Sequence, residues 1–242
     1  MATVAEILTH AAKRCSVKEP NGWAAATAAS AVELRDDIMF QVVEDILDRV
    51  DPPRPISKSA TLTGDGTSET FTLPTDFRRL QRGRFAIFQT GYPTKQFVPV
   101  HDDGEYDAIK DQGLAGATFY YRINALQGAQ SIDIYNPPAS GTTINLNYVS
   151  NRWIRDASSD DDEFQDDADI SYLPKQLLSA GITYRFRERK GLDYGDVQQD
   201  FELQLARFAN RNNTTRRIGP SQRDVRWVFD IPVPDFIPPG SP

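Results

Sequence analysis

Apolar residues at three- and four-residue steps predict two helices at the start of the chain. The stripe of the first consists of Val4, Ile7, Leu8, Ala11, Ala12 and Cys15. The stretch Glu19-Pro-Asn-Gly22 then indicates a turn. The second helix is expected from about Ala28 to Val50, with an apolar face of Ile38, Met39, Val42, Val43, Ile46, Leu47 and Val50. The stretch Asp51-Pro-Pro-Arg-Pro55 ends it, because proline has no backbone N–H and restricts the residue before it.

From about residue 57 to 155 the pattern is that of short strands, rich in Thr, Val, Ile, Phe and Tyr and separated by Gly and Pro. The expected strands are Ser59–Thr63, Glu69–Leu73, Phe85–Thr90, Gln96–Val100, Ala117–Ile123, Ser131–Tyr135 and Thr143–Ser150. Gly64-Asp-Gly66 lies between the first two, which predicts a hairpin there. Residues 102–110 predict a short helix between strands. We expect a small antiparallel β-sandwich or barrel.

Helical spacing returns after about residue 170. Pro174 suits a first helical turn, and Leu177, Leu178, Ile182 and Phe186 continue one stripe. Gly191 is placed to end this helix with a left-handed residue, and Asp193 to cap the next. The stripe of that last helix is Tyr194, Val197, Phe201, Leu205 and Phe208.

The pattern changes again after Asn213, where prolines alternate with apolar residues. Such a segment is expected to be an extended arm that packs on its own domain or on a neighbouring chain. Its candidate anchors for a partner surface are Trp227, Phe229, Ile231, Phe236 and Ile237.

The order of elements predicts an α+β fold in which a β-domain is inserted into a helical bundle. The expected parts are N-terminal helices over 1–55, the β-domain over 56–155, an acidic loop over 156–169, C-terminal helices over 170–213 and the arm over 214–242. The two helical ends can then bury their stripes against each other.

The amino-acid composition and net charge exclude several classes of function. The 242 residues correspond to one large domain or two small ones. The chain holds 27 Lys and Arg against 34 Asp and Glu, a net charge of −7, which argues against a broad nucleic-acid-binding face. One cysteine excludes an intrachain disulfide and a cysteine-based zinc site, and two histidines do not make a multi-histidine metal site. No signal peptide and no membrane span are expected, so the protein is predicted to be made in a cytoplasm.

Catalytic motifs are absent from the sequence. Gly64-Asp-Gly-Thr-Ser-Glu69 begins like a dinucleotide fingerprint, but it precedes a predicted strand and not a helix N-terminus. No phosphate-loop pattern, HExxH or GxSxG occurs. A serine–histidine pair and a carboxylate pair remain as alternatives that no spacing favours. We expect no enzyme, no cofactor and no bound metal.

Residues 156–169 hold eight acids and no base, so this one segment accounts for the whole acidic excess of the chain. It has no glycine for an EF-hand turn. The simplest interpretation is a solvated or mobile acidic linker; a looser calcium or magnesium site and an electrostatic role are the alternatives. The residues for the electrostatic role are Asp160, Asp161, Asp162, Asp166 and Asp167.

A basic run follows downstream, from residue 207 to 223, without an acid. It includes Arg207, Arg211, Arg216 and Arg217. The simplest interpretation is a solvated face with local salt bridges, and phosphate contacts are an alternative. A further hypothesis is that, in a ring of identical chains, the acidic loop of one subunit meets this run on the next subunit. The aromatic residues of the predicted strands are interpreted as packing, with a stacking platform for sugars or bases as the alternative.

Three stretches, taken in order, resemble the head-to-tail adaptor (connector) proteins of tailed bacteriophages. The first is Phe71-Thr-Leu-Pro-Thr-Asp-Phe-Arg-Arg-Leu80. The second is Phe119-Tyr-Tyr-Arg-Ile123, followed by Ile132-Asp-Ile-Tyr-Asn-Pro-Pro138 and Ile144-Asn-Leu-Asn-Tyr-Val149. The third is Leu173-Pro-Lys-Gln-Leu-Leu178, then Tyr184-Arg-Phe186 and Lys190-Gly-Leu-Asp-Tyr194. The resemblance covers about residues 1–213.

The resemblance implies a structural virion protein at the neck, where head and tail meet. Such proteins assemble as a ring, usually of twelve copies, below the portal protein. The ring extends the channel for double-stranded DNA, which passes without specific binding, and offers a platform to the next neck or tail protein. No membrane is involved.

Two other functions remain open. A β-sandwich module that recognises a receptor or glycan, or another tail structural module, would depend on the central strands. Deleting residues 57–155 separates it from an adaptor, which is expected to keep its helical bundle. A metal-assisted hydrolase using the acidic loop would respond to a chelator.

Overall fold

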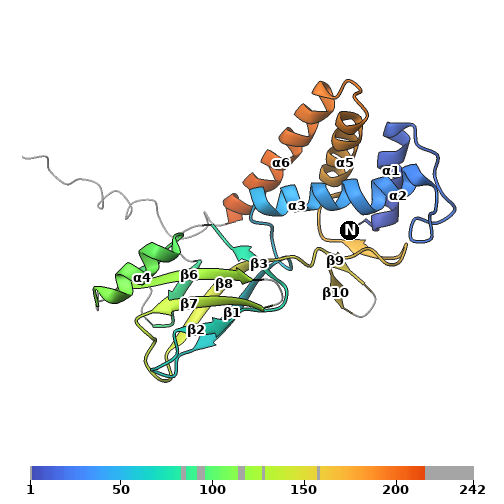
Figure 1. Ribbon diagram of the computed structural model, residues 1–242. Helices are drawn as coiled ribbons and strands as arrows, with labels where there is room; N and C mark the ends of the chain where they lie inside the picture. Colours follow the sequence, from blue (N-terminus) through green and yellow to red (C-terminus); the bar gives the residue numbers. More distant parts are fainter. Residues whose placement is uncertain are drawn as a thin grey trace, which may run out of the picture.

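The computed structural model describes residues 2–82, 86–91, 96–113, 118–126, 129–156 and 159–215. In Figure 1 helices α1, α3, α5 and α6 gather at one end, and most strands lie at the other end together with α4. The predicted α+β class is confirmed. Within these ranges no helix has the length and apolar character needed to cross a membrane.

The N-terminal helices form where the apolar stripes predicted them. Helix α1 spans Val4–Cys15; the Thr3 hydroxyl accepts the Glu6 N–H at 3.2 Å, and Ser16 ends the helix in a left-handed conformation. The second predicted helix is one continuous helical stretch made of α2 (Ala29–Val32), a π-helical segment (Glu33–Ile38) and α3 (Met39–Arg49). Val50 is extended, so the helix ends before the prolines as expected.

The C-terminal helices are α5 (Lys175–Arg189) and α6 (Gly195–Thr215). Gly191 has a φ of +67° just after α5, and the Asp193 carboxylate accepts the Gly195 N–H at 3.3 Å, so both predicted boundary roles are confirmed. Pro174 differs slightly from expectation, because it caps α5 from outside and is not in its first turn.

One hydrophobic core contains buried residues from both ends of the chain. Helix α5 packs against α1, α3 and α6. Gly181 allows this close approach, since a Cβ there would lie 2.5 Å from Val42 Cγ1 and 2.9 Å from Phe201 Cε2. Val149, Trp153 and Ile154 belong to the same core although they lie within the predicted β-domain.

A second core contains buried residues from two four-stranded sheets. In the first sheet the central strand pairs with three others, all antiparallel: β8 (Thr143–Ser150) with β1 (Ser57–Thr63), β3 (Phe77–Leu80) and β4 (Ile87–Gln89). The second sheet has the order β2 (Thr70–Thr72), β7 (Ala129–Tyr135), β6 (Thr118–Leu126) and β5 (Gln96–Pro99). Strand β3 was not predicted. Neither sheet closes into a barrel within the described ranges.

The predicted hairpin around Gly64 is wrong. Strand β1 pairs with β8 and β2 pairs with β7, so the two neighbours in sequence belong to different sheets. Gly64 is needed for another reason: a Cβ there would lie 2.5 Å from the Pro138 carbonyl oxygen. The glycine therefore serves a close approach between two loops and not a two-residue turn.

The expectation of a purely antiparallel arrangement is also wrong, because β5 and β6 run parallel. Parallel neighbours need a crossover, and the connection between them holds α4 (Asp103–Asp111), the predicted short helix. Asp102 caps α4 by accepting the Glu105 N–H at 3.0 Å.

Candidate functional site

The acidic segment contributes to a small third sheet beneath α3, visible in Figure 1. Strand β9 (Ile154–Arg155) pairs with β10 (Asp160–Asp161) on one side and β11 (Ile170–Ser171) on the other. The segment also reaches the first sheet, since Lys58 lies 3.4 Å from Asp160 and 2.8 Å from Asp76. It therefore lies where the helices and the sheets meet.

Several acids of this segment bind backbone N–H groups. Asp167 accepts the N–H groups of Trp23 and Ala24, each at 2.9 Å, and so fixes the loop before α2. Asp169 is only 3% exposed and accepts the N–H groups of Gln165 and Asp166 at 2.9 Å. The interpretation as a solvated, mobile linker is therefore wrong for residues 159–169, because these carboxylates hold the local fold together.

Asp160 and Asp162 also have partners within the protein. The Tyr172 hydroxyl donates to Asp160 at 2.6 Å, and the Asn151 amide donates to Asp162 at 2.7 Å. Burial, followed by the neighbouring Asp161, raises the pKa of Asp162 above its usual range. Asp161 accepts the Asp162 N–H at 2.7 Å, and the exposed Asp166 accepts that of Ala168 at 2.8 Å. A role toward a neighbouring subunit or a DNA channel stays a prediction for Asp160, Asp161, Asp162, Asp166 and Asp167.

The predicted basic run is described only in part. Arg207 is exposed on α6 and has no ion pair with any described residue. Arg211 lies within α6, but its side chain is outside the described residues. Arg216, Arg217 and the arm anchors Trp227, Phe229, Ile231, Phe236 and Ile237 also lie outside the described residues. The structure does not bring the acidic and basic groups together within the parts that it describes.

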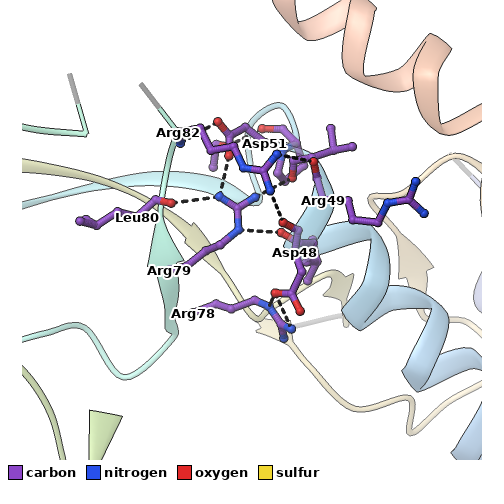
Figure 2. Close-up of polar contacts among 11 residues, drawn as sticks. Asp48, Arg49, Asp51, Arg78, Arg79, Leu80 and Arg82 are labelled. Atoms are coloured by element: carbon purple, nitrogen blue, oxygen red, sulfur yellow. Dashed lines mark hydrogen bonds and ion pairs between the residues drawn. The ribbon is translucent and has the colours of Figure 1, made fainter. Parts of the chain in front are cut away.

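A group that sequence reasoning missed joins α3 to the first sheet. Figure 2 shows Arg78, Arg79 and Arg82 reaching from β3 and the loop after it to the end of α3; we call these three residues the arginine junction. Arg79 donates to the carbonyl oxygens of Leu47 and Val50, both at 2.9 Å. Arg82 donates to the carbonyls of Asp48 at 2.8 Å and Arg49 at 3.0 Å.

The arginine junction supplies the hydrogen-bond donors and the positive charge that the C-terminal end of a helix lacks. The last carbonyls of a helix have no partner within it and carry partial negative charge, so guanidinium groups satisfy both needs. Acidic side chains complete the arrangement: Arg79 lies 2.7 Å from Asp51, and Arg78 binds Asp48 at 2.9 Å and also Glu44. Burial alone would lower the pKa of Arg78, but Glu44 and Asp48 outweigh it and raise that pKa.

The second sheet has its own buried charge. Asp133 on β7 accepts hydrogen bonds from Thr70 at 2.7 Å, Asn124 at 2.8 Å and Arg122 at 3.0 Å. The Arg122 guanidinium lies 4.5 Å from the centre of the Tyr106 ring, which fixes α4 on the sheet. Burial alone would raise the pKa of Asp133, but these three donors together lower it.

These contacts join helices to sheets and loops to helices. Among the described residues, no three His, Cys, Asp or Glu side chains are arranged to hold a metal ion. What the geometry provides is a set of fixed charged contacts that orient helices and sheets.

Comparison with known proteins identifies a family for this chain. No curated protein matches the chain at a significant level. A family model described as SU10 adaptor protein matches residues 2–227. This range includes both cores, the acidic segment and the arginine junction, and it extends past the 1–213 covered by the sequence resemblance. The chain therefore belongs to the SU10 adaptor protein family, a family of phage structural proteins.

Proposed function

We propose that this chain is the head-to-tail adaptor of a tailed phage. Identical copies form a ring, twelve in number, below the portal protein; the ring extends the DNA channel and docks the next neck or tail protein. The observation that carries the proposal is the adaptor-family match over residues 2–227. In this role the protein is made in the host cytoplasm, has no catalytic activity and is carried in the virion neck.

The two hydrophobic cores support a matching domain organisation. We assign the helices over 1–55 and 170–213 to a bundle, and residues 56–155 to a sandwich inserted into it, with Val149, Trp153 and Ile154 of that range packed in the core of the bundle. The arginine junction supports a fixed angle between the two parts, because its guanidinium groups bind backbone as well as side chains. A closed ring needs subunits of constant shape, since a small change of angle prevents closure.

Surface charge supports a channel that does not retain DNA. The net charge of −7 gives the ring a negative field that repels phosphate groups. Asp166 and Arg207 are both exposed, and they are available to a neighbouring subunit or to the channel. The charges that pair across the subunit interface are assigned to the acidic segment and to the basic run from residue 207.

Immunogold electron microscopy of purified virus particles tests the proposal. An antibody to this chain is expected to label the neck, between head and tail, and a pre-immune antibody serves as the control. Label at the distal tail would contradict the proposal and favour a receptor- or glycan-recognition module. Absence of label on intact and on disrupted particles would also contradict it.

A further inference from the structure

A groove runs along α3, between this helix, strand β3 and the residues that lie next to β9 and β10 in the sequence. It consists of two adjoining hollows of about 230 Å³ and 310 Å³, and Phe40, Trp153 and Asp162 line both. Phe40 lies between them and is 50% exposed, whereas its neighbour Met39 is buried. Phe164 borders one hollow and Phe77 the other. Of these aromatic side chains, Phe40 is half exposed and Phe164 is partly buried, whereas Phe77 and Trp153 are buried core residues that form the floor. Polar and charged side chains, among them Glu44, Arg78 and Asn151, complete the lining of the smaller hollow.

Aromatic-lined grooves of this kind bind extended proline-rich segments, because flat rings pack well against pyrrolidine rings and the ligand loses little entropy. The chain contains one such segment in its own sequence. Residues 227–239 include Pro232, Pro234, Pro238 and Pro239 between Trp227, Phe229 and Phe236. The groove and this segment have complementary chemistry.

Charge complementarity points the same way. The rim of the wider hollow carries Asp36, Asp162 and Glu163 against one base, Arg35. Arg35 is already committed within the protein, since it pairs with Asp36 and donates to the carbonyls of Trp23 and Ala24. The eleven residues 216–226 that precede the proline-rich segment hold four arginines and one aspartate. The rim is therefore acidic, and the segment that precedes the proline-rich residues is basic.

The chain is long enough for the proline-rich segment of one subunit to bind the groove of another. Helix α6 ends at Thr215, and Figure 1 shows this end beside the end of α3. A stretch of eleven residues spans at most about 40 Å when fully extended, so the length of residues 216–226 is sufficient for a segment that follows them to bind an adjacent subunit. In a closed ring every subunit has one groove and one arm, so a head-to-tail exchange fills every groove.

We propose that the groove around Phe40 binds residues 227–239 of the neighbouring copy. This inference rests on the proposed ring. It names the site on the neighbour that receives the arm, where the sequence indicated only that some partner surface exists. The half-exposed Phe40 ring is the central contact, and Asp162 and Glu163 meet the arginines that lead into the segment.

Photo-crosslinking in the full-length chain tests this proposal. A benzoylphenylalanine replaces Phe40, and chains labelled with heavy isotopes are mixed in equal amount with unlabelled chains before irradiation. Mass spectrometry is expected to find crosslinks from position 40 to residues 227–239, with heavy–light pairs among them. The same probe at Leu203, 49% exposed on α6, is the matched control and is expected not to reach that segment.

Crosslinks from position 40 that fall elsewhere, that are absent, or that join only residues of the same chain would overturn the proposal. As a second measurement, Phe40→Glu is expected to keep the thermal unfolding midpoint, because the side chain is half exposed, and to lose the self-association seen by sedimentation velocity. Unchanged association would also overturn it. Neck labelling of particles is independent of both results, so failure of the groove is distinguishable from failure of the adaptor function.

Discussion

At the scale of single residues, the hydrogen bonds of buried polar groups contribute to the stability of the sheets. Asp76 is 8% exposed and accepts hydrogen bonds from Lys58 and Ser150, each at 2.8 Å, and from the Tyr148 hydroxyl at 3.0 Å. Burial alone would raise the pKa of Asp76, but these three donors together lower it below its ordinary value. The ionised form is therefore the one that stabilises the fold.

Asp76→Asn is expected to lower the free energy of unfolding at neutral pH by about 1–3 kcal/mol, because the charge-assisted bonds to Lys58 and Ser150 weaken. The folded pKa is depressed, so this stabilisation is present above the unfolded pKa near about 4 and is lost as pH falls through the folded pKa. Urea unfolding from neutral to acidic pH measures it. The difference between the variant and the native chain is expected to shrink in acid, and the exposed Asp107→Asn serves as the control. A difference independent of pH would contradict the assignment.

Two tyrosines give a matched pair. The Tyr106 side chain is 1% exposed, and its hydroxyl has no hydrogen-bond partner in the described part of the chain, whereas the Tyr148 hydroxyl donates to Asp76. Tyr106→Phe is expected to leave stability unchanged or raise it by about 1 kcal/mol, because a desolvated hydroxyl without a partner is removed. Tyr148→Phe is expected to lower stability by a similar amount. Thermal or urea unfolding compares them, and a loss at Tyr106 as large as that at Tyr148 would be the contrary result.

At the scale of elements, the end of α3 depends on residues that lie about thirty positions further along the chain. The carbonyls of Leu47 and Val50 accept from Arg79, and those of Asp48 and Arg49 accept from Arg82. The packing of α5 against α3 depends instead on Gly181, where the absence of a side chain leaves room for Val42. One contact orients α3 against a sheet and the other brings it close to α5.

Arg79→Lys is expected to destabilise the protein by about 1–3 kcal/mol although it conserves charge. A lysine ammonium is a point donor and cannot span two carbonyls and the Asp51 carboxylate as the planar guanidinium does. Hydrogen exchange of the last turn of α3 is expected to quicken in the same variant. Arg207→Lys, at an exposed position, is the control and is expected to change neither property. Equal behaviour of the two variants would show that the arginine junction contributes charge alone.

Gly181→Ala tests the close approach of α5. Alanine favours a helix over glycine by about 1 kcal/mol, yet its Cβ would lie 2.5 Å from Val42 Cγ1, so a net loss of about 1–3 kcal/mol is expected. Gly195→Ala is the matched control, because the nearest atom to a Cβ there is 3.9 Å away. Chemical denaturation measures both. A stabilised Gly181→Ala variant would mean that α3 and α6 can move away from α5 with little loss of packing energy.

At the scale of the whole molecule, the sequence predicted what depends on local periodicity. The stripes of α1, α3 and α5 and the boundary residues Gly191 and Asp193 follow from spacing and from local backbone preference. The hairpin at Gly64 was wrong because a glycine needed for a close approach looks the same in sequence as one needed for a turn. The arginine junction could not be recognised in the sequence, because its partners are backbone carbonyls and acidic side chains about thirty positions earlier in the chain. Acidic residues that cap loops also cannot be told from solvated ones by composition.

The structure also moves the boundary of the inserted part, which changes the deletion experiment. Removing residues 57–155 would take Val149, Trp153 and Ile154 out of the helical core, where they are at most 2% exposed. Lys58 and Tyr148 are cross-strand partners, so their Cα atoms lie about 5 Å apart and a short turn can join them. Replacing residues 59–147 by Asn-Gly therefore removes the second core and leaves the first complete.

This replacement variant is expected to fold with a helical circular dichroism spectrum and a cooperative thermal transition, at lower stability than the native chain. The carbonyls at the end of α3 lose the arginine junction, but they become exposed to water, which satisfies them. The deletion of 57–155 is the comparison and is expected to lose the cooperative transition, because large apolar side chains leave a shared core. If both variants unfold alike, the helices depend on the sheets and the chain is one folding unit. If only the shorter excision folds, the helical core is an independent unit that carries the sheets as an insertion.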